Sequence, residues 1–431
     1  MIFYPGRYYF MSWILLKMMD FTSFGEKFNG TSGILQLMDD LGQGVGDPGT
    51  IMLGGGNPSS ISEVHAYFES QMRSIVGQPE IFQRLIGTYA SPRGHTAFIE
   101  AFVELVNGLY HWGISSENVV LTNGSQIAFF YLFNLFGGES SRGFRKILLP
   151  LTPEYIGYED LGLSRGIFAS YRPVIELLHD NLFKYRVDFN ALTISPEIGA
   201  LCVSRPTNPT GNVLTEDEIE QLSVLAESCN IPLIIDNAYG APFPGIIFSE
   251  IKPRWNPSIV MCLSLSKLGL PGIRTGIIVA RKEITRRIAN MNAIISLSPG
   301  NIGPGLSLKG VQSGDILRLC REVIRPHYKS GIENAIAVSR RLFRGLDFRI
   351  HVPEGSILIW IWFPALRIST QELYVRVKRR GVLIVPGHYF FPGLENDAWD
   401  HKSQCIRINV GASPEDVEKG LAIIAEEVRD A

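Results

Sequence analysis

Short apolar runs alternate with longer amphipathic segments between about residues 117 and 280. This alternation is typical of crossover units, in which helices cover both faces of a mostly parallel sheet. The runs predict seven strands, at residues 118–122, 146–150, 166–172, 200–204, 232–236, 259–264 and 276–280. We therefore expect an α/β domain built on one broad, mostly parallel seven-stranded sheet.

A second pattern begins after Asp315, where a long helical region rich in basic residues leads into strands near residues 357–363 and 405–410. This change indicates a smaller α+β domain at the C-terminal end. Within the first domain, Thr215-Glu216-Asp217-Glu218 predicts a helix start, because Thr215 can cap the helix while Glu218 reaches back to it. The expected organisation is an N-terminal arm or extension (1–18), a segment joining the small domain (19–65), a large domain (66–310) and a small domain (311–431).

Composition narrows the class of partner. The 431 residues carry 40 Lys+Arg against 42 Asp+Glu, so we expect a small molecule rather than nucleic acid or a membrane. The five cysteines are far apart and form no Cys/His cluster, which argues against disulfides and metal sites and favours a reducing cytoplasm. The apolar stretch in residues 1–18 is short and is interrupted by Lys17, which predicts a terminal arm rather than an export signal.

Lys267 is the first candidate for chemistry. It lies in Ser264-Leu265-Ser266-Lys267, directly after one predicted strand and before the turn that carries Arg274. A lysine in this place can form an imine with a carbonyl cofactor, and Arg274, Ser264 and Ser266 can bind a phosphate. Most lysines simply face water, so this interpretation depends on the motifs that accompany it.

Two of these motifs also follow predicted strands. Asp236-Asn237-Ala238-Tyr239 stands at a strand end, where ligands gather in open α/β sheets. Asp236 can pair with a protonated pyridine nitrogen and Tyr239 can bind a ring phenolate, although a turn or helix cap is an alternative interpretation of this run. Asn208 is held between two prolines in Arg205-Pro206-Thr207-Asn208-Pro209-Thr210-Gly211 and can donate to the same phenolate.

A candidate phosphate seat is formed by Thr122-Asn123-Gly124-Ser125-Gln126, which precedes an apolar helix. The free N–H groups and dipole of a helix N-terminus bind anions, and Gly124 permits close approach. Ordinary capped helices begin in the same way, so this motif gains weight only from the others.

Together these motifs resemble the fold type I pyridoxal-phosphate aminotransferases of classes I and II, from about Gly54 to the C-terminus. The matching positions are Asn208 in NPTG, Asp236 and Tyr239 in DxAY, Lys267 in SxSK, and Arg274 in the following GxR turn. The resemblance implies pyridoxal 5′-phosphate as cofactor. The cofactor-binding residues it implies are Tyr89, Gly124, Ser125, Gln126, Tyr155, Asn208, Asp236, Tyr239, Ser264, Ser266, Lys267 and Arg274.

The same resemblance implies the remaining parts of an active site. Tyr155 corresponds to the aromatic side chain that stacks on the cofactor ring, and Tyr89 to the tyrosine that reaches the phosphate of a neighbouring subunit in a homodimer. Arg407 corresponds to the arginine that binds the substrate α-carboxylate, with Asn208 and Gly56 beside it. A planar guanidinium suits this task because it binds a carboxylate through two parallel hydrogen bonds.

The implied reaction is transamination between an apolar amino acid, such as valine or alanine, and a 2-oxo acid such as pyruvate. Lys267 would act as general base and acid, assisted by Asp236 and Tyr239, and Ile34, Leu35 and Tyr155 are candidates for an apolar pocket. The alternatives are a related aminotransferase or C–S lyase with another substrate. A non-catalytic regulator half is disfavoured, because the residues before Gly54 leave no room for a DNA-binding domain.

Overall fold

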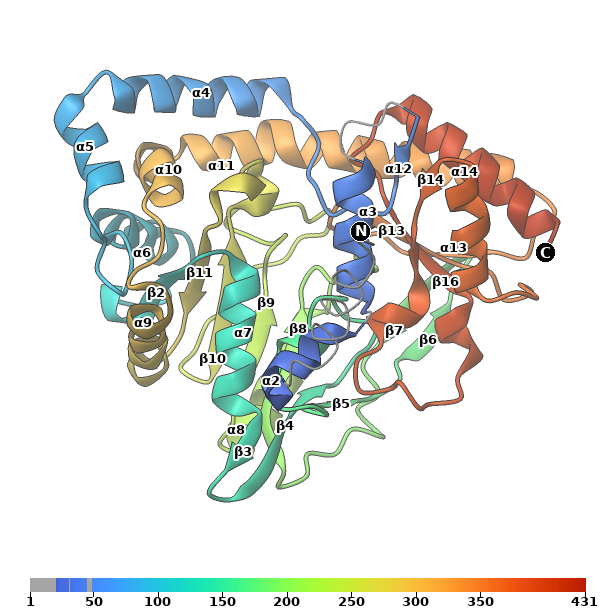
Figure 1. The fold of residues 1–431 in the computed structure, drawn as a ribbon, viewed down its shortest axis with the longest axis horizontal. Helices are drawn as coiled ribbons and strands as arrows, with labels where there is room; N and C mark the ends of the chain where they lie inside the picture. The colour runs from blue at the N-terminus through green and yellow to red at the C-terminus, as the bar shows by residue number, and fades with distance from the viewer. Residues whose placement is uncertain (1–20, 31, 45–48) are drawn as a thin grey trace, which may run out of the picture.

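A computed structural model of the chain describes residues 21–30, 32–44 and 49–431, and the arm expected at 1–18 lies outside these residues. Figure 1 shows a large sheet with helices on both faces and, to its right, a smaller sheet covered by the C-terminal helices. None of the described helices is long and apolar enough to cross a membrane.

The large sheet contains all seven strands expected from the sequence. Its order is β2-β11-β10-β9-β8-β4-β3, and β5 also pairs with β4. The strands are β2 (Val119–Thr122), β3 (Gly138–Ser140), β4 (Gly143–Leu149), β5 (Phe168–Ser170), β8 (Ile198–Ser204), β9 (Leu233–Asp236), β10 (Ile259–Ser264) and β11 (Gly276–Val279). Since β11 is antiparallel to both of its neighbours while the central pairs are parallel, β2, β8, β9 and β10 end at the same edge.

The expected number of strands was wrong by one. The eighth strand, β3, is a short antiparallel partner of β4, and its Glu139 and Ser140 are exposed. An exposed polar strand has no apolar run by which it could be recognised in the sequence.

The central strands are buried on both faces, which explains their continuous apolar runs. In β8, Leu201 and Val203 belong to one hydrophobic cluster, whereas Ala200 and Cys202 belong to another on the opposite face. The first cluster includes side chains of α4 (Ser62–Val76), α6 (Thr96–Tyr110), α8 (Glu216–Ser228), α10 (Ile302–Ser313) and α11 (Asp315–Leu319); the second includes side chains of α7 (Ser125–Phe136) and α9 (Lys282–Ser296). The expected cap of α8 is confirmed, because Thr215 Oγ1 accepts from the Glu218 N–H and the Glu218 carboxylate accepts from the Thr215 N–H.

The second sheet has the order β15-β16-β13-β12-β7-β6. Its strands are β6 (Val174–Leu177), β7 (Leu182–Arg186), β12 (Arg349–His351), β13 (Leu358–Trp362), β15 (Val385–Pro386) and β16 (Cys405–Asn409). It packs against α12 (Arg325–Leu342), α13 (Thr370–Arg379) and α14 (Pro414–Arg429) around a separate hydrophobic cluster. Two of its strands, β6 and β7, come from the middle of the stretch expected to form the large domain.

The N-terminal segment lies beside the second sheet and its helices. Strand β1 (Ile51–Met52) pairs with β14 (Val382–Leu383), and α2 (Ser23–Glu26) and α3 (Gly33–Gly44) precede it. Asp40 of α3 is buried, and its two carboxylate oxygens accept hydrogen bonds from Tyr374 Oη and Lys378 Nζ, each at 2.7 Å. These contacts attach α3 to α13.

Candidate active site

A cavity of about 670 Å³ opens where β2, β8, β9 and β10 end. It brings together twelve of the residues that the sequence predicted, although they come from distant parts of the chain. They are Gly56, Ser125, Gln126, Tyr155, Asn208, Asp236, Tyr239, Ser264, Ser266, Lys267, Arg274 and Arg407.

Lys267 lies in a 3-10 turn, η4 (Ser266–Leu268), that begins one residue after the end of β10. Its Nζ donates to the Gly56 carbonyl oxygen at 2.5 Å and lies 5.6 Å from the centre of the Tyr239 ring. Burial, together with the positive charges of Arg407 and Arg274, lowers the pKa of Lys267 to about 8, while the negative charge of Asp236 acts in the opposite direction. The amine is therefore closer to its neutral, nucleophilic form than an exposed lysine.

Asp236 is the last residue of β9 and faces the cavity. Its Oδ2 accepts from Tyr158 Oη at 2.7 Å and its Oδ1 accepts from the Ala238 N–H at 3.0 Å. Burial raises the pKa of the Asp236 carboxyl to about 6, whereas these two hydrogen bonds and the charge of Lys267 act in the opposite direction. Asp236 is thus a partly buried acid whose charge the surrounding donors support.

The turn before α7 shows why a glycine is needed there. Gly124 has φ of +89°, and a Cβ added at this position would lie 2.2 Å from Nη2 of Arg274. Arg274 is held in place by hydrogen bonds from its Nη1 to the Pro271 carbonyl (3.1 Å) and Ser266 Oγ (3.4 Å). A guanidinium beside the free N–H groups of a helix N-terminus is well suited to bind a phosphate dianion.

Arg407 lies on β16 and is almost fully buried, with 1% of its surface exposed. Its Nη1 donates to Asn208 Oδ1 at 2.9 Å and its Nη2 donates to the Gly54 carbonyl at 2.6 Å, while Nε has no hydrogen-bond partner among the described residues. Burial lowers the pKa of Arg407 to about 10, and the residues that partly offset this are the tyrosines Tyr239 and Tyr155. Arg407 is a buried cation without a carboxylate of the described chain to neutralise it.

The residues present fit pyridoxal 5′-phosphate. Tyr239 Oη is buried and lacks a hydrogen-bond partner within the described part of the chain, which is costly unless a ligand supplies one. Asp236, Lys267 and the Gly124–Arg274 pair offer a carboxylate, an amine and a phosphate seat around one cavity. A pyridine nitrogen, an aldehyde and a phosphate are the complementary groups.

One side of the cavity was only partly predicted. Ile34, Leu37, Met38 and Leu41 of α3 all line it, whereas Leu35, expected in the apolar pocket, is exposed and lies outside. The spacing i, i+3, i+4, i+7 places the lining residues on one helical stripe and turns Leu35 away from it. That spacing is visible in the sequence and could have identified the α3 wall, the name we use for these four residues.

Three polar residues beneath Asp236 were missed. Tyr158 donates to Asp236, and Glu154 and Ser204 hydrogen-bond to each other, all three being buried. Tyr158 lies three residues after Tyr155 in the same run, but its partner is 78 residues away in the chain. No local signal marks such a contact.

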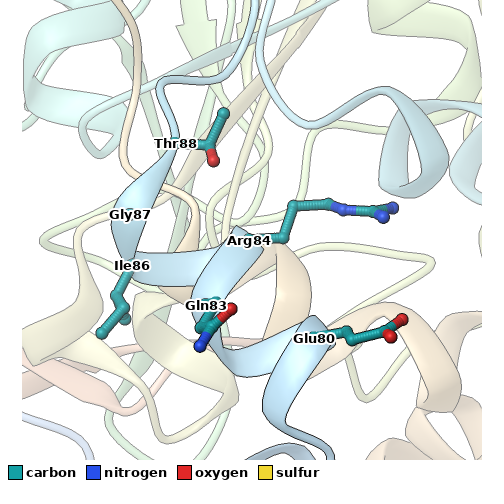
Figure 2. A pocket seen from close by; sticks show the side chains of 6 residues that line it. All are labelled: Glu80, Gln83, Arg84, Ile86, Gly87 and Thr88. Carbon is teal, nitrogen blue, oxygen red and sulfur yellow. The ribbon is translucent and has the colours of Figure 1, made fainter.

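Besides Leu35, two predicted residues do not line the cavity. Gly124 lies behind Arg274, as described above, and Tyr89 lies in a surface groove, with 76% of its surface exposed. A neighbouring hollow on α5 (Pro79–Gly87) is drawn in Figure 2, where Glu80, Gln83, Arg84 and Ile86 project from the helix. Its lining contains neither a lysine nor an aromatic residue, so it lacks the groups that distinguish the Lys267 cavity.

Comparison with known proteins agrees with this geometry. The family described as aminotransferase class I and II matches residues 80–424. The chain belongs to this family. It is therefore a pyridoxal-phosphate-dependent aminotransferase, and the fold type I architecture expected from the sequence is confirmed.

Individual relatives of this aminotransferase cover nearly its whole length. Valine–pyruvate aminotransferase of Escherichia coli (strain K12) is 51% identical over 414 residues, which is 96% of this chain and 99% of the relative. The crystal structure of valine–pyruvate aminotransferase from Salmonella typhimurium LT2 is 50% identical, with a TM-score of 0.85 over 92% of this chain and 98% of the other. A Thermus thermophilus aspartate aminotransferase with maleate, 18% identical, has a TM-score of 0.75 over 95% of this chain and 100% of the other, which shows the shared fold alone.

The runs Gly54–Pro58, Thr122–Gln126 and Pro153–Tyr158 resemble valine–pyruvate aminotransferase within the family. The comparisons therefore agree with the resemblance that these runs carry.

Proposed function

We propose that this aminotransferase exchanges amino groups between valine or alanine and a 2-oxo acid, such as pyruvate or 3-methyl-2-oxobutanoate. The observation that carries the proposal is that Lys267 shares its cavity with one buried arginine, Arg407, that neither a carboxylate of the described chain nor the phosphate seat engages. The other arginine on the described walls, Arg274, faces the phosphate seat. One free guanidinium matches a substrate with one carboxylate, whereas aspartate or glutamate would bring a second.

The α3 wall supports a branched apolar side chain. Ile34, Leu37, Met38 and Leu41 present hydrocarbon to the cavity, and burial of each substrate CH₂ against such a surface is worth ~0.8 kcal/mol. A carboxylate buried against the same residues would lose its hydration without gaining a partner. The wall therefore favours valine over aspartate.

The proposed mechanism assigns one task to each residue. When bound, pyridoxal phosphate supplies an electron sink for the pair of electrons that remains when the substrate α-C–H bond breaks. Arg407 and Asn208 hold the substrate carboxylate, which orients the α-hydrogen toward Lys267 Nζ. Lys267 Nζ would accept this proton as a general base and give it up again as a general acid. Asp236 would support a proton on the pyridine nitrogen of the bound group, and Tyr239 Oη would donate to its ring oxygen.

The test is a substrate panel. Purified protein should transfer the amino group of valine and alanine to pyruvate or 3-methyl-2-oxobutanoate much faster than that of aspartate or phenylalanine. Product 2-oxo acids and amino acids are quantified by chromatography. Preferential use of aspartate, or ammonia release without transfer, would reject the proposal and favour the alternative aminotransferase or lyase.

We further propose a homodimer in which Tyr89 of one subunit reaches the phosphate seat of the other. Support comes from two sets of exposed apolar side chains: Ile81, Ile86 and Tyr89 on and after α5, and Ile294, Ile295, Leu297 and Ile302 at the end of α9 and the start of α10. The loop between α9 and α10 contacts both the Tyr89 groove and the turn that begins α7, because Asn301 Nδ2 donates to the Thr88 carbonyl (2.9 Å) and the Gly300 N–H donates to Asn123 Oδ1 (2.9 Å). Exposed apolar side chains gathered in this way mark interfaces. Sedimentation equilibrium tests this proposal, because a homodimer should have twice the mass of one chain.

We also propose that the enzyme is cytoplasmic and that it serves amino-acid biosynthesis. Support comes from the five cysteines, none of which forms a disulfide, and from the substrates proposed above. Cell fractionation, and amino-acid requirements of a strain that lacks the gene, test the two parts separately.

A further inference from the structure

Glu154 is a buried acid that the proposed mechanism does not use. Its side chain is completely inaccessible to solvent, and among the described residues no lysine or arginine forms an ion pair with it. An ionised carboxylate buried without a cation is costly, so its protonation state needs an explanation.

Hydrogen bonds connect Glu154 to the floor of the active site. The Ser204 N–H donates to Glu154 Oε1 at 2.8 Å, and Ser204 Oγ shares a hydrogen bond with Glu154 Oε2. Ser204 Oγ lies 3.4 Å from Tyr158 Oη, which donates to Asp236 Oδ2 at 2.7 Å. We call Glu154, Ser204, Tyr158 and Asp236 the acid chain.

The acid chain has two possible states, with Glu154 protonated or ionised, and they differ in the number of hydrogens available for its hydrogen bonds. The single hydroxyl hydrogen of Tyr158 points at Asp236, so the contact between Ser204 and Tyr158 requires the Ser204 hydrogen. Ser204 can supply it only if Glu154 carries a proton of its own and donates to Ser204 Oγ. If Glu154 is ionised, Ser204 must donate to Glu154, and two oxygen atoms then face each other without a hydrogen.

The electrostatic environment favours the same state. Burial and the negative charge of Asp236 together raise the pKa of Glu154 to about 8, although the hydrogen bonds from Ser204 and from the Tyr155 N–H act in the opposite direction. Tyr158 within the chain and Cys202 beside it both keep their protons, because burial and the negative charge of Asp236 raise their pKa values. Two carboxyls this close do not both ionise readily.

We propose that Glu154 is a neutral carboxylic acid and a positioning residue, which donates to Ser204 so that Ser204 donates to Tyr158 and Tyr158 donates to Asp236. Every hydrogen in the acid chain then points toward Asp236. Hydrogen bonds aligned in one direction polarise one another, which strengthens the last donor. The chain thereby favours the ionised form of Asp236 and opposes the burial that raises the pKa of this carboxyl.

The protonation state can be measured without turnover. Infrared spectra of the holoenzyme should contain a carboxylic acid C=O band that moves in D₂O and is absent from Glu154→Gln. If the wild-type and Glu154→Gln proteins show no such difference at neutral pH, the proposal is wrong. This result does not depend on which amino acid the enzyme uses, so it is separate from the substrate panel.

The effect on the pKa of Asp236 is measured by the pH at which kcat/KM falls on the acid side of its pH profile, called the acid limb below. Cofactor affinity is measured across the same pH range. This part rests on the proposed role of Asp236. Removal of the last donor by Tyr158→Phe should move the acid limb up by about one pH unit, since a hydrogen bond to a charged group is lost. Ser204→Ala should move it by a few tenths of a unit, on the order of 10–30% of that effect.

Variants of Glu154 separate positioning from packing. Glu154→Gln retains an N–H donor toward Ser204 and should leave the acid limb in place, whereas Glu154→Met fills the space without a donor and should move it as Ser204→Ala does. Ser339→Ala, a buried serine of α12 that donates to the Ala335 carbonyl, is the matched control and should cause no movement. Equal shifts for Gln and Met, or a shift in the control, would overturn the positioning role.

Discussion

Replacing Arg407 should damage substrate binding far more than cofactor binding. Arg407→Lys keeps a positive charge but replaces a planar fork with a single ammonium group, and Arg407→Met removes the charge. In the wild-type protein the guanidinium is fixed by Asn208 Oδ1 and the Gly54 carbonyl, and it is not neutralised by a carboxylate of the described chain. The substrate carboxylate is the proposed counter-ion.

The magnitude follows from the number of hydrogen bonds lost. A hydrogen bond to a charged group is worth ~1.5–3 kcal/mol, so loss of one prong in Arg407→Lys should lower kcat/KM roughly 10- to 150-fold. Loss of both prongs in Arg407→Met should lower it by roughly 10² to 10⁴. The assay is the half-reaction with valine, followed through cofactor absorbance, with the cofactor dissociation constant measured in parallel.

A substrate without a carboxylate provides the control. 2-Methylpropylamine has the valine skeleton but no carboxylate, so its slow reaction should be almost unaffected by Arg407→Met. The comparison isolates the interaction between Arg407 and the carboxylate, as in a double-mutant cycle. An equal loss for valine and for the amine, or a loss of cofactor affinity that accounts for the whole effect, would refute the reasoning.

Other residues give further expectations. Lys267→Ala should lose turnover, and it should no longer form the cofactor adduct that borohydride traps and mass spectrometry detects. Retention of either property would contradict the role of Lys267. Burial lowers the pKa of Lys267 from 10.5 to about 8, so unfolded chains bind more protons between these values and stability rises with pH there. Lys267→Met should therefore stabilise the cofactor-free protein by up to about 3 kcal/mol at neutral pH and less as pH rises through this window, measured by urea unfolding. Mixing inactive Tyr89 and Lys267 variants should restore partial activity if subunits share sites; no recovery despite subunit exchange argues against sharing. Asp40→Asn weakens the contacts of α3 with Tyr374 and Lys378 and should raise the KM for valine, while cofactor affinity stays unchanged in the same titration.

The sequence predicted the large sheet well because its strands are buried on both faces. Runs such as Ala200–Val203 are then apolar throughout, and the polar residues that follow each run mark the strand ends. β6 could not be recognised in this way, because its side chains are largely exposed and it pairs only with β7 in the second sheet. Its fold depends on partners rather than on its own composition.

The cavity residues that were predicted and those that were missed differ in the same respect, namely whether a local sequence pattern marks them. Lys267, Asp236 and Asn208 were found because each belongs to a compact motif directly after a strand. Tyr158 was missed, since a tyrosine in a loop has many possible partners and only the folded chain brings Asp236 to its hydroxyl. The α3 wall depends on Asp40, whose partner Tyr374 lies 334 residues further along the chain.

The segment between β10 and β11 carries Lys267 near one end and Arg274 near the other. Both ends are fixed, because Ser264 and Gly276 are paired in adjacent strands. The separation between the amine and the guanidinium is therefore set within one short turn rather than by the relative placement of two domains. An inserted residue in this segment should change the distance between the amine and the guanidinium while the sheet remains intact. The segment would thereby determine the length of cofactor that the cavity accepts.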